Sequence, residues 1–522
     1  MNSFIKFIFT LFCVSAASIQ LSAQGIVPKP VSIDEGKNEY RIPESLKISV
    51  EDKSLDITRD VFIQDMQNIL DVNASDKKAD IILSLNPKLE NEEYVLSVDR
   101  RKILIEGGNR SGVHYGLQTL KQLLVNKRIP CQIIKDKPFF EYRGTMLDVS
   151  RHFFTVDEVK SFIDILSLHK MNKMHWHLTD DPGWRIEIKK YPKLTEIGSW
   201  RKETIVGFHK TSNTFDGIPH SGYYTQDEIK DIVKYASDRC VEIIPEIELP
   251  GHSIAALASY PWLGCTEGPY EVITKWGVYD DIYCVGKEST FEFLQNVLSE
   301  IIELFPSKYI HIGGDECPKA KWKKCPDCQR RMKELGLKKV DELQGYFTRR
   351  IEKWLLQHDR KIIGWDETLY CGVSENTTIM SWRDAKHGIE AAKKGNHVIM
   401  TPVKNCYLDY YQTADPEKNH EKLAFPRYLP VQQVYRLEPF DQLTPEQQSY
   451  VIGVQGCVWT EFIADFEHVE WMMLPRLAAL SETAWAYDRK NYKDFENRMP
   501  TMRLLYEKYH YNYAPFMFEG IE

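Results

Sequence analysis

From residue 142 onward, short apolar runs alternate with stretches whose apolar residues recur at helical spacing. The apolar runs predict eight strands, at residues 143–147, 173–178, 241–246, 309–312, 361–365, 378–381, 397–401 and 451–455. Two of the intervening stretches begin with a Thr-x-x-Glu capping box, at Thr155 and at Thr225. Eight strands, mostly separated by helices, predict an α/β fold of the (β/α)8 barrel type. A doubly wound open sheet is the alternative, although no Gly-x-Gly-x-x-Gly follows an early strand.

The segment before the barrel has a different pattern. Apolar runs at 81–85, 94–98 and 102–105 predict strands, a turn follows at 106–109, and residues 112–124 carry apolar side chains at helical spacing. This segment has no evident cluster of reactive side chains. We therefore interpret residues 24–137 as a small α+β supporting domain and residues 138–487 as the catalytic barrel. Residues 488–522 are expected to form a C-terminal helix and tail packed on that barrel.

The first 23 residues have the pattern of a secretory signal peptide. Lys6 precedes a mostly apolar run at residues 7–17, and Ser22-Ala23 is a small-residue cleavage site. We expect an exported protein, periplasmic or secreted, and an uncleaved anchor helix is the alternative. Small residues do not precede Cys13, so a lipid anchor there is not expected. No other stretch is long and apolar enough to cross a bilayer.

Amino-acid composition says less about function than the pattern of apolar and polar positions does. The formal net charge is −8 and no long Lys/Arg stripe is present, which argues against a nucleic-acid partner. Aromatic residues make up 12% of the chain, with 12 Trp and 27 Tyr. Such rings stack on the flat faces of sugars, but a large aromatic core explains the same count and is the better reading of composition alone.

Ten cysteines follow the signal peptide, and an exported protein is expected to oxidise some of them. Cys265 and Cys284 flank one loop and are a candidate disulfide pair. Cys317, Cys325 and Cys328 form a tighter group that ends in Cys-Pro-Asp-Cys, a spacing found in zinc sites. Because no fourth ligand is evident nearby, we favour a disulfide or free thiols over a metal for this group.

Polar or aromatic side chains follow every predicted strand, at the edge where barrels of this class carry their active sites. They are Asp148 and Arg151; His177, Asp180 and Asp181; Glu246, Glu248 and His252; His311, Asp315 and Glu316; Trp365, Asp366 and Glu367; Trp382 and Arg383; Tyr407 and Asp409; Trp459 and Glu461. Each alone is readily a helix cap, a core ring or a structural ion pair. Their presence at all eight strand ends favours one site for a neutral, hydroxyl-rich ligand.

Asp315 and Glu316 stand out among these residues. They follow Gly313-Gly314, which allow the backbone to turn sharply at a strand end. Two neighbouring carboxylates disfavour each other's ionisation, so one can stay protonated near neutral pH and act as a general acid. Glycoside hydrolysis requires such an acid, because the leaving oxygen is protonated as its bond breaks. A helix cap followed by a surface acid is the alternative reading.

The chain resembles glycoside hydrolase family 20, the β-N-acetylhexosaminidases. The resemblance runs through most of the chain after the signal peptide. The segments that carry it are G-V-H-Y-G-L-Q-T-L at 112–120, Y-R-G-T-M-L-D-V-S-R at 142–151, H-W-H-L-T-D-D at 175–181, P-E-I-E-L-P-G-H at 245–252, H-I-G-G-D-E at 311–316, G-W-D-E at 364–367, Y-L-D at 407–409 and W-T-E at 459–461. H-I-G-G-D-E is highly specific in this order and context, whereas W-T-E alone would be weak.

The resemblance implies an exo-acting, retaining enzyme that removes terminal GlcNAc or GalNAc by substrate-assisted catalysis, without cofactor or metal. Glu316 would protonate the glycosidic oxygen and later activate water, and Asp315 would orient the substrate's 2-acetamido group and stabilise its developing charge. The remaining implied roles are a hydrogen bond from Tyr407 to the acetamido oxygen; a pocket wall of Trp365, Trp382 and Trp459; hydroxyl binding by Arg151, Asp409 and Glu461; and tuning of the Glu316 proton affinity by Asp180 and His252.

Two other classes of function are alternatives to this one. A non-catalytic sugar-binding protein on a decayed barrel would keep the tryptophans, but it would lose the acid pair that is present here. A metal-dependent barrel hydrolase or lyase would use His177, His252 and His311 as ligands, but their neighbours are more acidic than a zinc triad needs. The expected partner is a glycan with a terminal N-acetylhexosamine. The sequence leaves open the preferred sugar, the linkage, a homo-oligomeric state and the role of residues 413–422.

Overall fold

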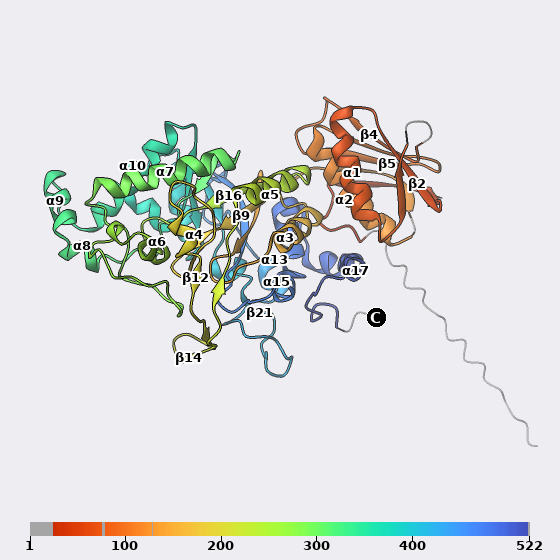
Figure 1. Ribbon diagram of the computed structural model, residues 1–522. Coiled ribbons are helices and arrows are strands. Elements are labelled where there is room, and N and C mark those ends of the chain that lie inside the picture. Colours follow the sequence, from red (N-terminus) through yellow and green to blue (C-terminus); the bar gives the residue numbers. More distant parts are fainter. Residues whose placement is uncertain (1–24, 76–78, 128, 520–522) are drawn as a thin grey trace, which may run out of the picture.

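The computed structural model describes residues 25–75, 79–127 and 129–519, so the predicted signal peptide and Cys13 lie outside the described residues. The chain forms a sheet domain and a barrel that lie side by side (Figure 1). Within the described ranges, no helix combines the length and the apolar character needed to span a membrane.

The barrel is closed by eight parallel strands. In spatial order they are β8 (Tyr142–Asp148), β9 (Lys173–His177), β16 (Glu242–Glu246), β17 (Tyr309–His311), β18 (Lys361–Trp365), β19 (Thr378–Ser381), β20 (Val398–Met400) and β23 (Val451–Val458). β23 pairs with β8, which closes the sheet on itself and rules out the open-sheet alternative. The predicted (β/α)8 barrel is confirmed. All eight predicted strands are present, and β23 extends furthest beyond its predicted end.

Helices surround the barrel strands; most bury one face, and α16 (Arg476–Ala486) is buried along its whole length. The other main ones are α3 (Val156–Leu168), α5 (Gln226–Asp238), α7 (Glu288–Leu304), α10 (Asp341–Leu356) and α11 (Ala385–Lys393). α3 and α5 start at the predicted capping boxes, in which a threonine side chain accepts from the backbone N–H of Glu158 or Glu228 and the glutamate reaches back. Between β18 and β19 the connection is a 3-10 helix, η3 (Asp366–Cys371), instead of an α-helix.

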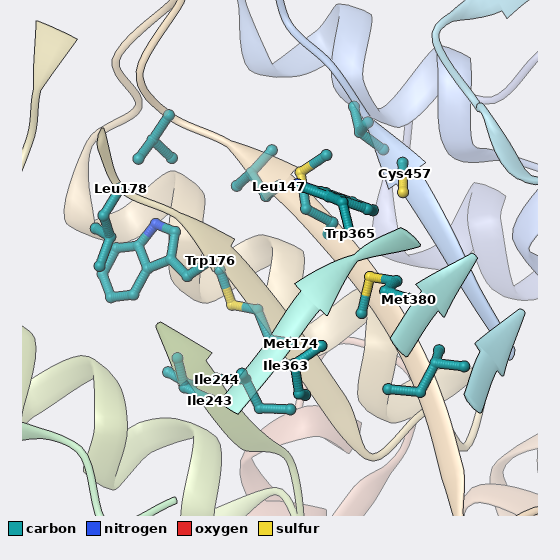
Figure 2. Close-up of a cluster of buried hydrophobic side chains, with 14 of the residues drawn as sticks. Leu147, Met174, Trp176, Leu178, Ile243, Ile244, Ile363, Trp365, Met380 and Cys457 are labelled. Carbon is teal, nitrogen blue, oxygen red and sulfur yellow. The ribbon is translucent and has the colours of Figure 1, made fainter. Parts of the chain in front are cut away.

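The barrel strands are buried on both faces, and this explains their nearly continuous apolar runs. Figure 2 shows side chains of neighbouring strands packed together, among them Met174 and Trp176 on β9 and Ile243 and Ile244 on β16. All four are at most 3% exposed. A core of this kind fixes the strand ends rigidly, and it is at those ends that the predicted site residues lie.

The sheet domain has seven strands, in the order β1 (Ser32–Tyr40), β7 (Ile129–Asp136), β5 (Tyr94–Val98), β6 (Ile103–Gly107), β4 (Ile81–Leu85), β2 (Ser45–Val50) and β3 (Asp71–Ala74). Helices α1 (Asp56–Met66) and α2 (Arg110–Val125) pack against it. The sequence predicted β4, β5, β6 and α2 but missed the others. β1 has six consecutive exposed residues, so it lacks the alternation that marks a half-buried strand. The predicted turn at 106–109 overlaps β6, which continues through Gly107.

A buried polar cluster joins the sheet domain to the barrel. Lys170 Nζ lies 3.1 Å from Asp136 Oδ2 and donates to the Tyr94 hydroxyl at 2.9 Å. Trp485 Nε1 donates to Asp136 Oδ1 at 2.9 Å, and the side chains of Lys170 and Asp136 are fully buried. Separating the two units would leave these charges unpaired in an apolar interface, so the cluster holds them in one arrangement. Helix α17 (Tyr492–Tyr509) also packs on the barrel core through Met499 and Tyr506, among others.

The cysteines group differently from the prediction. Cys265 and Cys284 do come together, but they share their position with Cys325 and Cys328. Cys317 belongs to no such group in the described residues, because it lies on the segment that directly follows Glu316, ahead of α8 (Ala320–Lys324). None of the ten cysteines in the described residues takes part in a disulfide, so the predicted Cys265–Cys284 pair is not formed.

Candidate active site

A cavity of about 510 Å³ opens at the carboxyl ends of the barrel strands. The eleven residues to which the family resemblance gave roles all line it: Arg151, Asp180, His252, Asp315, Glu316, Trp365, Trp382, Tyr407, Asp409, Trp459 and Glu461. Of the other predicted residues at the strand ends, Glu248 and Arg383 also line it, whereas Asp148, His177, Asp181, Glu246, His311, Asp366 and Glu367 are not among the lining residues. The eleven residues are spread over more than 300 positions of the sequence. The closed barrel brings them together, because each lies at or just after the end of a strand.

The turn after β17 places Asp315 and Glu316. Gly313 and Gly314 have φ of +64° and +97°, in the left-handed region that favours glycine. A Cβ atom at Gly313 would lie 1.8 Å from Glu248 Oε2, so a larger residue there would force the buried Glu248 side chain to move. Glu316 itself has a φ of +41°, an uncommon conformation for a non-glycine residue that occurs at functional sites. As a result the Asp315 side chain is only 12% exposed, whereas the Glu316 side chain remains 43% exposed.

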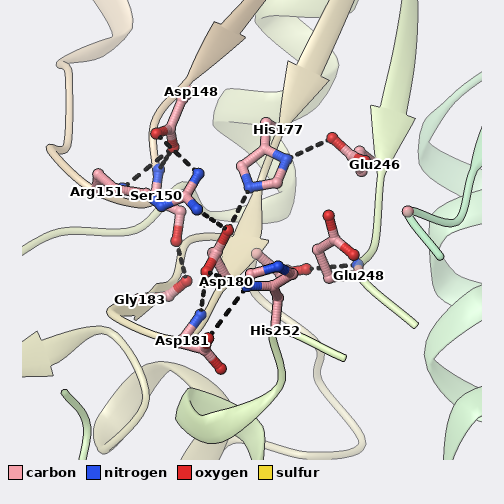
Figure 3. A network of polar contacts seen from close by, with 12 residues as sticks. Asp148, Ser150, Arg151, His177, Asp180, Asp181, Gly183, Glu246, Glu248 and His252 are labelled. Atoms are coloured by element: carbon pink, nitrogen blue, oxygen red, sulfur yellow. Dashed lines mark hydrogen bonds and ion pairs between the residues drawn. The ribbon is translucent and has the colours of Figure 1, made fainter. Parts of the chain in front are cut away.

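His252 lies between this carboxylate pair and a second pair of acids. Its Nε2 is 3.7 Å from Asp315 Oδ2 and 3.6 Å from Glu316 Oε2. Its Nδ1 is 3.1 Å from Asp181 Oδ2 and 3.4 Å from Asp180 Oδ1 (Figure 3). Burial acts to lower the pKa of His252, but Asp180 and Asp181 raise it well above its ordinary value. His252 is therefore expected to be positively charged at neutral pH.

The side chains behind His252 form a continuous polar network (Figure 3). Arg151 Nη2 lies 2.8 Å from Asp180 Oδ2, and His177 Nε2 lies 3.0 Å from the same oxygen. His177 in turn contacts the carboxylate of Glu246 through Nδ1. Burial acts to raise the pKa of Asp180, but Arg151 and His252 lower it well below its usual range. Asp180 therefore stays ionised and fixes the orientation and charge of His252.

The carboxyl groups of Asp315 and Glu316 differ in proton affinity, because Asp315 is more deeply buried. Burial raises the pKa of Asp315 well above its ordinary value; His252 opposes this, while the charges of Glu367 and Glu316 add to it. Contact with His252 lowers the pKa of Glu316, against the effect of partial burial. In the empty cavity the proton shared by the pair is therefore expected on Asp315. Asp315 Oδ1 has no hydrogen-bond partner within the described chain and is available to a ligand.

Aromatic rings form one wall of the cavity. Trp382 and Tyr407 stack with their planes 21° apart and their centroids 6.2 Å apart, and Trp365 lies 5.9 Å from Trp459. Tyr407 also contacts Trp459, with centroids 6.3 Å apart. Trp382 Nε1 donates to Glu367 Oε2 at 3.0 Å, which fixes the indole. This wall is suited to the apolar face of a sugar ring or to a methyl group.

Charged and neutral polar groups lie beyond the aromatic wall. The Arg151 guanidinium sits over the Trp459 ring, 4.9 Å from its centroid. Burial raises the pKa of Asp409 well above its ordinary value, and the neighbouring Glu461 adds to this. Burial also raises the pKa of Glu461, although Arg151 opposes the shift. Carboxyl groups of this kind both donate to and accept from sugar hydroxyls.

The three histidines of the metal-dependent alternative do not assemble into a triad. His177 and His311 each contact Glu246, whereas His252 contacts Asp180 and Asp181 on the cavity side. In the described part of the chain, no candidate cluster of liganding groups contains all three. This arrangement does not support the alternative in which the three act together as ligands, and each histidine has a carboxylate partner.

Several lining residues lie outside the predicted set: His209 and Trp276 sit on irregular loops, and the others lie on the short strands β21 (Tyr410–Tyr411) and β22 (Phe425–Tyr428). His209, Trp276, Tyr410, Phe425 and Arg427 also face the cavity. Trp276 is 5% exposed. The guanidinium carbon of Arg201 lies over its ring, 5.2 Å from the ring centroid. No periodic pattern marks such loops, and a lone Trp gives no positional signal. Residues 413–422 do not line the cavity, whereas Phe425 and Arg427 just after them do.

Two models of one protein family match most of the chain. The family model described as glycosyl hydrolase family 20, catalytic domain, matches residues 140–488, and the model described as glycosyl hydrolase family 20, domain 2, matches residues 23–137. A β-hexosaminidase of Porphyromonas gingivalis is 40% identical; the match covers 94% of this chain and 64% of that protein, so the chain spans less than two thirds of that relative. A β-hexosaminidase of Vibrio furnissii is 36% identical, with 87% and 76% covered.

Solved structures show the same architecture. A GH20 exo β-N-acetylglucosaminidase from Vibrio harveyi, in complex with N-acetylglucosamine, superposes with a TM-score of 0.84. It is 32% identical, and the match covers 94% of this chain and 78% of that one.

Proposed function

The chain belongs to glycosyl hydrolase family 20, and we propose that it is an exo-acting, retaining β-N-acetylhexosaminidase that works by substrate-assisted catalysis. The observation that carries this proposal is the arrangement of buried Asp315 beside half-exposed Glu316, in a cavity with an aromatic wall. The names of the relatives, and the sugar bound to the Vibrio harveyi enzyme, support N-acetylhexosamine as the substrate class.

In the first step, the substrate's acetamido oxygen attacks the anomeric carbon while the glycosidic C–O bond breaks. Glu316 gives its proton to the leaving oxygen. Asp315 accepts a hydrogen bond from the acetamido N–H, and its negative charge balances the oxazolinium that forms. Tyr407 donates a hydrogen bond to the acetamido oxygen. In the second step, Glu316 takes a proton from water and the water attacks the anomeric carbon. The bond from that carbon to the acetamido oxygen breaks, so the oxazolinium ring opens and the sugar is released with retention of configuration.

Substrate binding must redistribute the proton shared by the carboxylate pair. In the empty cavity the pKa directions place it on Asp315. A sugar that fills the cavity excludes water from Glu316 and so raises the pKa of that carboxyl. Positive charge developing on the acetamido group lowers the pKa of Asp315 in the same complex. The pair therefore reaches the transition state with the proton on Glu316 and the charge on Asp315, and it titrates as a unit.

His252→Gln is expected to move both limbs of the kcat/KM profile to higher pH. The active form of the free enzyme carries one proton on the Asp315–Glu316 pair. The acid limb reports protonation of Glu316 and the alkaline limb reports loss of the proton from Asp315, and charged His252 lowers both pKa values. Removing that charge lets both pKa values rise. Hydrolysis of an aryl N-acetylglucosaminide measured across pH tests this, and limbs that stay in place would contradict the assignment.

Exo-action is expected from the polar groups beyond the aromatic wall. Arg151, Asp409 and Glu461 are placed to bind the outer hydroxyls of a terminal sugar, so a glycan that continued past this sugar would lose contacts with them. Digestion of a linear N-acetylglucosamine tetrasaccharide should therefore release monosaccharide from the first time point, with trisaccharide as the initial co-product. Disaccharide formed as a first product from the tetrasaccharide would show internal cleavage and refute exo-action.

The cellular location is also part of the proposal. On the basis of the signal-like pattern at residues 1–23, we place the enzyme outside the cytoplasm, in a periplasm or the medium, where glycans of other cells are encountered.

A further inference from the structure

Four cysteines from two barrel loops meet at one point. Cys265 and Cys284 lie in the β16 loop (residues 247–287), and Cys325 and Cys328 lie in the β17 loop (residues 312–340). One ligand atom from each falls within 4.8 Å of all the others. Cys284, Cys325 and Cys328 are buried, and Cys265 is half-buried. The loops belong to consecutive strands, and their helices α6 (Ile254–Ser259), α8 and α9 (Pro326–Glu334) lie on the side of the barrel away from the sheet domain (Figure 1).

The sulfur–sulfur distances match a tetrahedral metal centre. Cys284 Sγ lies 3.6 Å from Cys325 Sγ and 3.7 Å from Cys328 Sγ, and Cys265 Sγ lies 3.8 Å from Cys328 Sγ. With a zinc–sulfur bond of about 2.3 Å, the edge of a tetrahedron of four thiolates is about 3.8 Å. Disulfides require sulfur atoms about 2.05 Å apart in two exclusive pairs. Here Cys284 is equally close to two partners, as a shared central ion requires.

The surrounding backbone is shaped to hold such a centre. Cys325 caps the N-terminus of α9, and Cys328 lies in its first turn, where the helix dipole favours thiolate charge. A Cβ atom at Gly286 would lie 2.2 Å from the Asp327 carbonyl carbon, so the two loops touch backbone to backbone there. Lys287 adds a positive charge at the same place and donates to the Gly264 carbonyl at 3.1 Å.

We propose that Cys265, Cys284, Cys325 and Cys328 bind one structural zinc ion that ties the β16 loop to the β17 loop. Four protein thiolates leave no open position on zinc, so the ion takes no part in the chemistry. The residues between Cys265 and Cys284 include Ile273, Trp276 and Val278, which line the cavity. The β17 loop carries Asp315 and Glu316. Zinc therefore fixes a cavity wall relative to the acid pair.

The first test is the metal and thiol content of the wild-type full-length protein, purified without chelator or reductant. Zinc is measured by elemental analysis, and native mass spectrometry gives its stoichiometry. Alkylation after denaturation in a chelator, followed by peptide mapping, reports the state of each cysteine. We expect one zinc per chain and four alkylated cluster cysteines. Peptides joined through Cys265, Cys284, Cys325 or Cys328 would overturn the proposal, and so would free thiols without zinc.

Matched variants locate the ion. Cys325→Ser is expected to lose the zinc, whereas Cys317→Ser, which removes the neighbouring cysteine outside the cluster, is expected to keep it. If Cys325→Ser fails to fold, protein produced with cobalt in place of zinc gives an independent readout. A tetrahedral tetrathiolate site shows intense visible bands and thiolate-to-cobalt charge transfer in the near ultraviolet. Zinc lost in both serine variants or in neither, or a cobalt protein without these bands, would refute this ligand set.

A further experiment tests whether zinc fixes the cavity wall formed by residues 265–284. Removal of zinc is expected to make residues 265–284 more sensitive to limited proteolysis and to raise KM for an aryl N-acetylglucosaminide more than it lowers kcat. Unchanged proteolysis would show that the ion does not fix this loop. Zinc content does not depend on glycosidase activity, so failure of this proposal and failure of the proposed function are distinguishable.

Discussion

Glu316→Gln is expected to lower kcat/KM for aryl N-acetylglucosaminides by about 10²–10⁴-fold, the range for loss of a general acid. The amide keeps the shape of the side chain but has no proton to give to the leaving oxygen. It is also unable to take a proton from water in the second step. The change should leave folding intact, because the Glu316 side chain is 43% exposed and its charged partner is His252. Thermal unfolding compared with wild type checks that condition.

Leaving-group dependence sharpens this prediction. A phenolate of low pKa departs without protonation, so Glu316→Gln should be least impaired on substrates with strongly activated phenols and most impaired on alkyl glycosides. Glu334→Gln, an exposed carboxylate of the β17 loop, is the matched control and should keep wild-type rates. An equal loss on every leaving group would contradict the assignment of Glu316 as the proton donor.

Asp315→Asn is expected to slow hydrolysis by about 10²–10³-fold, corresponding to about 3–4 kcal/mol for one oriented charge-stabilising group. Asparagine resembles the protonated aspartic acid that burial favours in the empty cavity. Folding and ground-state binding should therefore change little. The negative charge is needed only when the acetamido group becomes positive, so kcat should fall much more than KM rises.

Inhibition by a thiazoline mimic of the oxazolinium intermediate tests the same role. Wild-type enzyme should bind the mimic far more tightly than it binds N-acetylglucosamine, and Asp315→Asn should lose most of that advantage. Equal affinity of wild type and variant for the mimic would show that Asp315 does not stabilise the intermediate.

Much of the barrel and its site followed from local pattern. Buried parallel strands read as continuous apolar runs, so Lys361–Trp365 and Thr378–Ser381 were predicted with their observed ends. The eleven residues to which the family resemblance gave roles all line the cavity, whereas other strand-end residues, such as His177, Glu246 and His311, contact one another in a buried network behind it. The turn at Gly313-Gly314 was readable because glycine pairs mark left-handed backbone.

What the sequence did not provide depends on contacts between distant segments. The proton preference of Asp315 over Glu316 comes from burial and from His252, more than sixty positions earlier. Cys325 and Cys328 form their group with Cys265 and Cys284. Sequence spacing alone had paired Cys265 and Cys284 only with each other. Trp276 lies on an irregular loop whose path is set by tertiary packing. These features become visible only when the loops are placed in space.

The central claim, that the nucleophile is the substrate's own acetamido oxygen, is tested most directly with a series of aryl glycosides carrying acetamido, fluoroacetamido, difluoroacetamido and trifluoroacetamido groups. Fluorine withdraws electrons from the carbonyl oxygen and weakens it as a nucleophile without adding much bulk. The account predicts that kcat falls steeply and progressively along the series for the wild-type enzyme. A kcat that stays constant from acetamido to trifluoroacetamido would contradict substrate assistance.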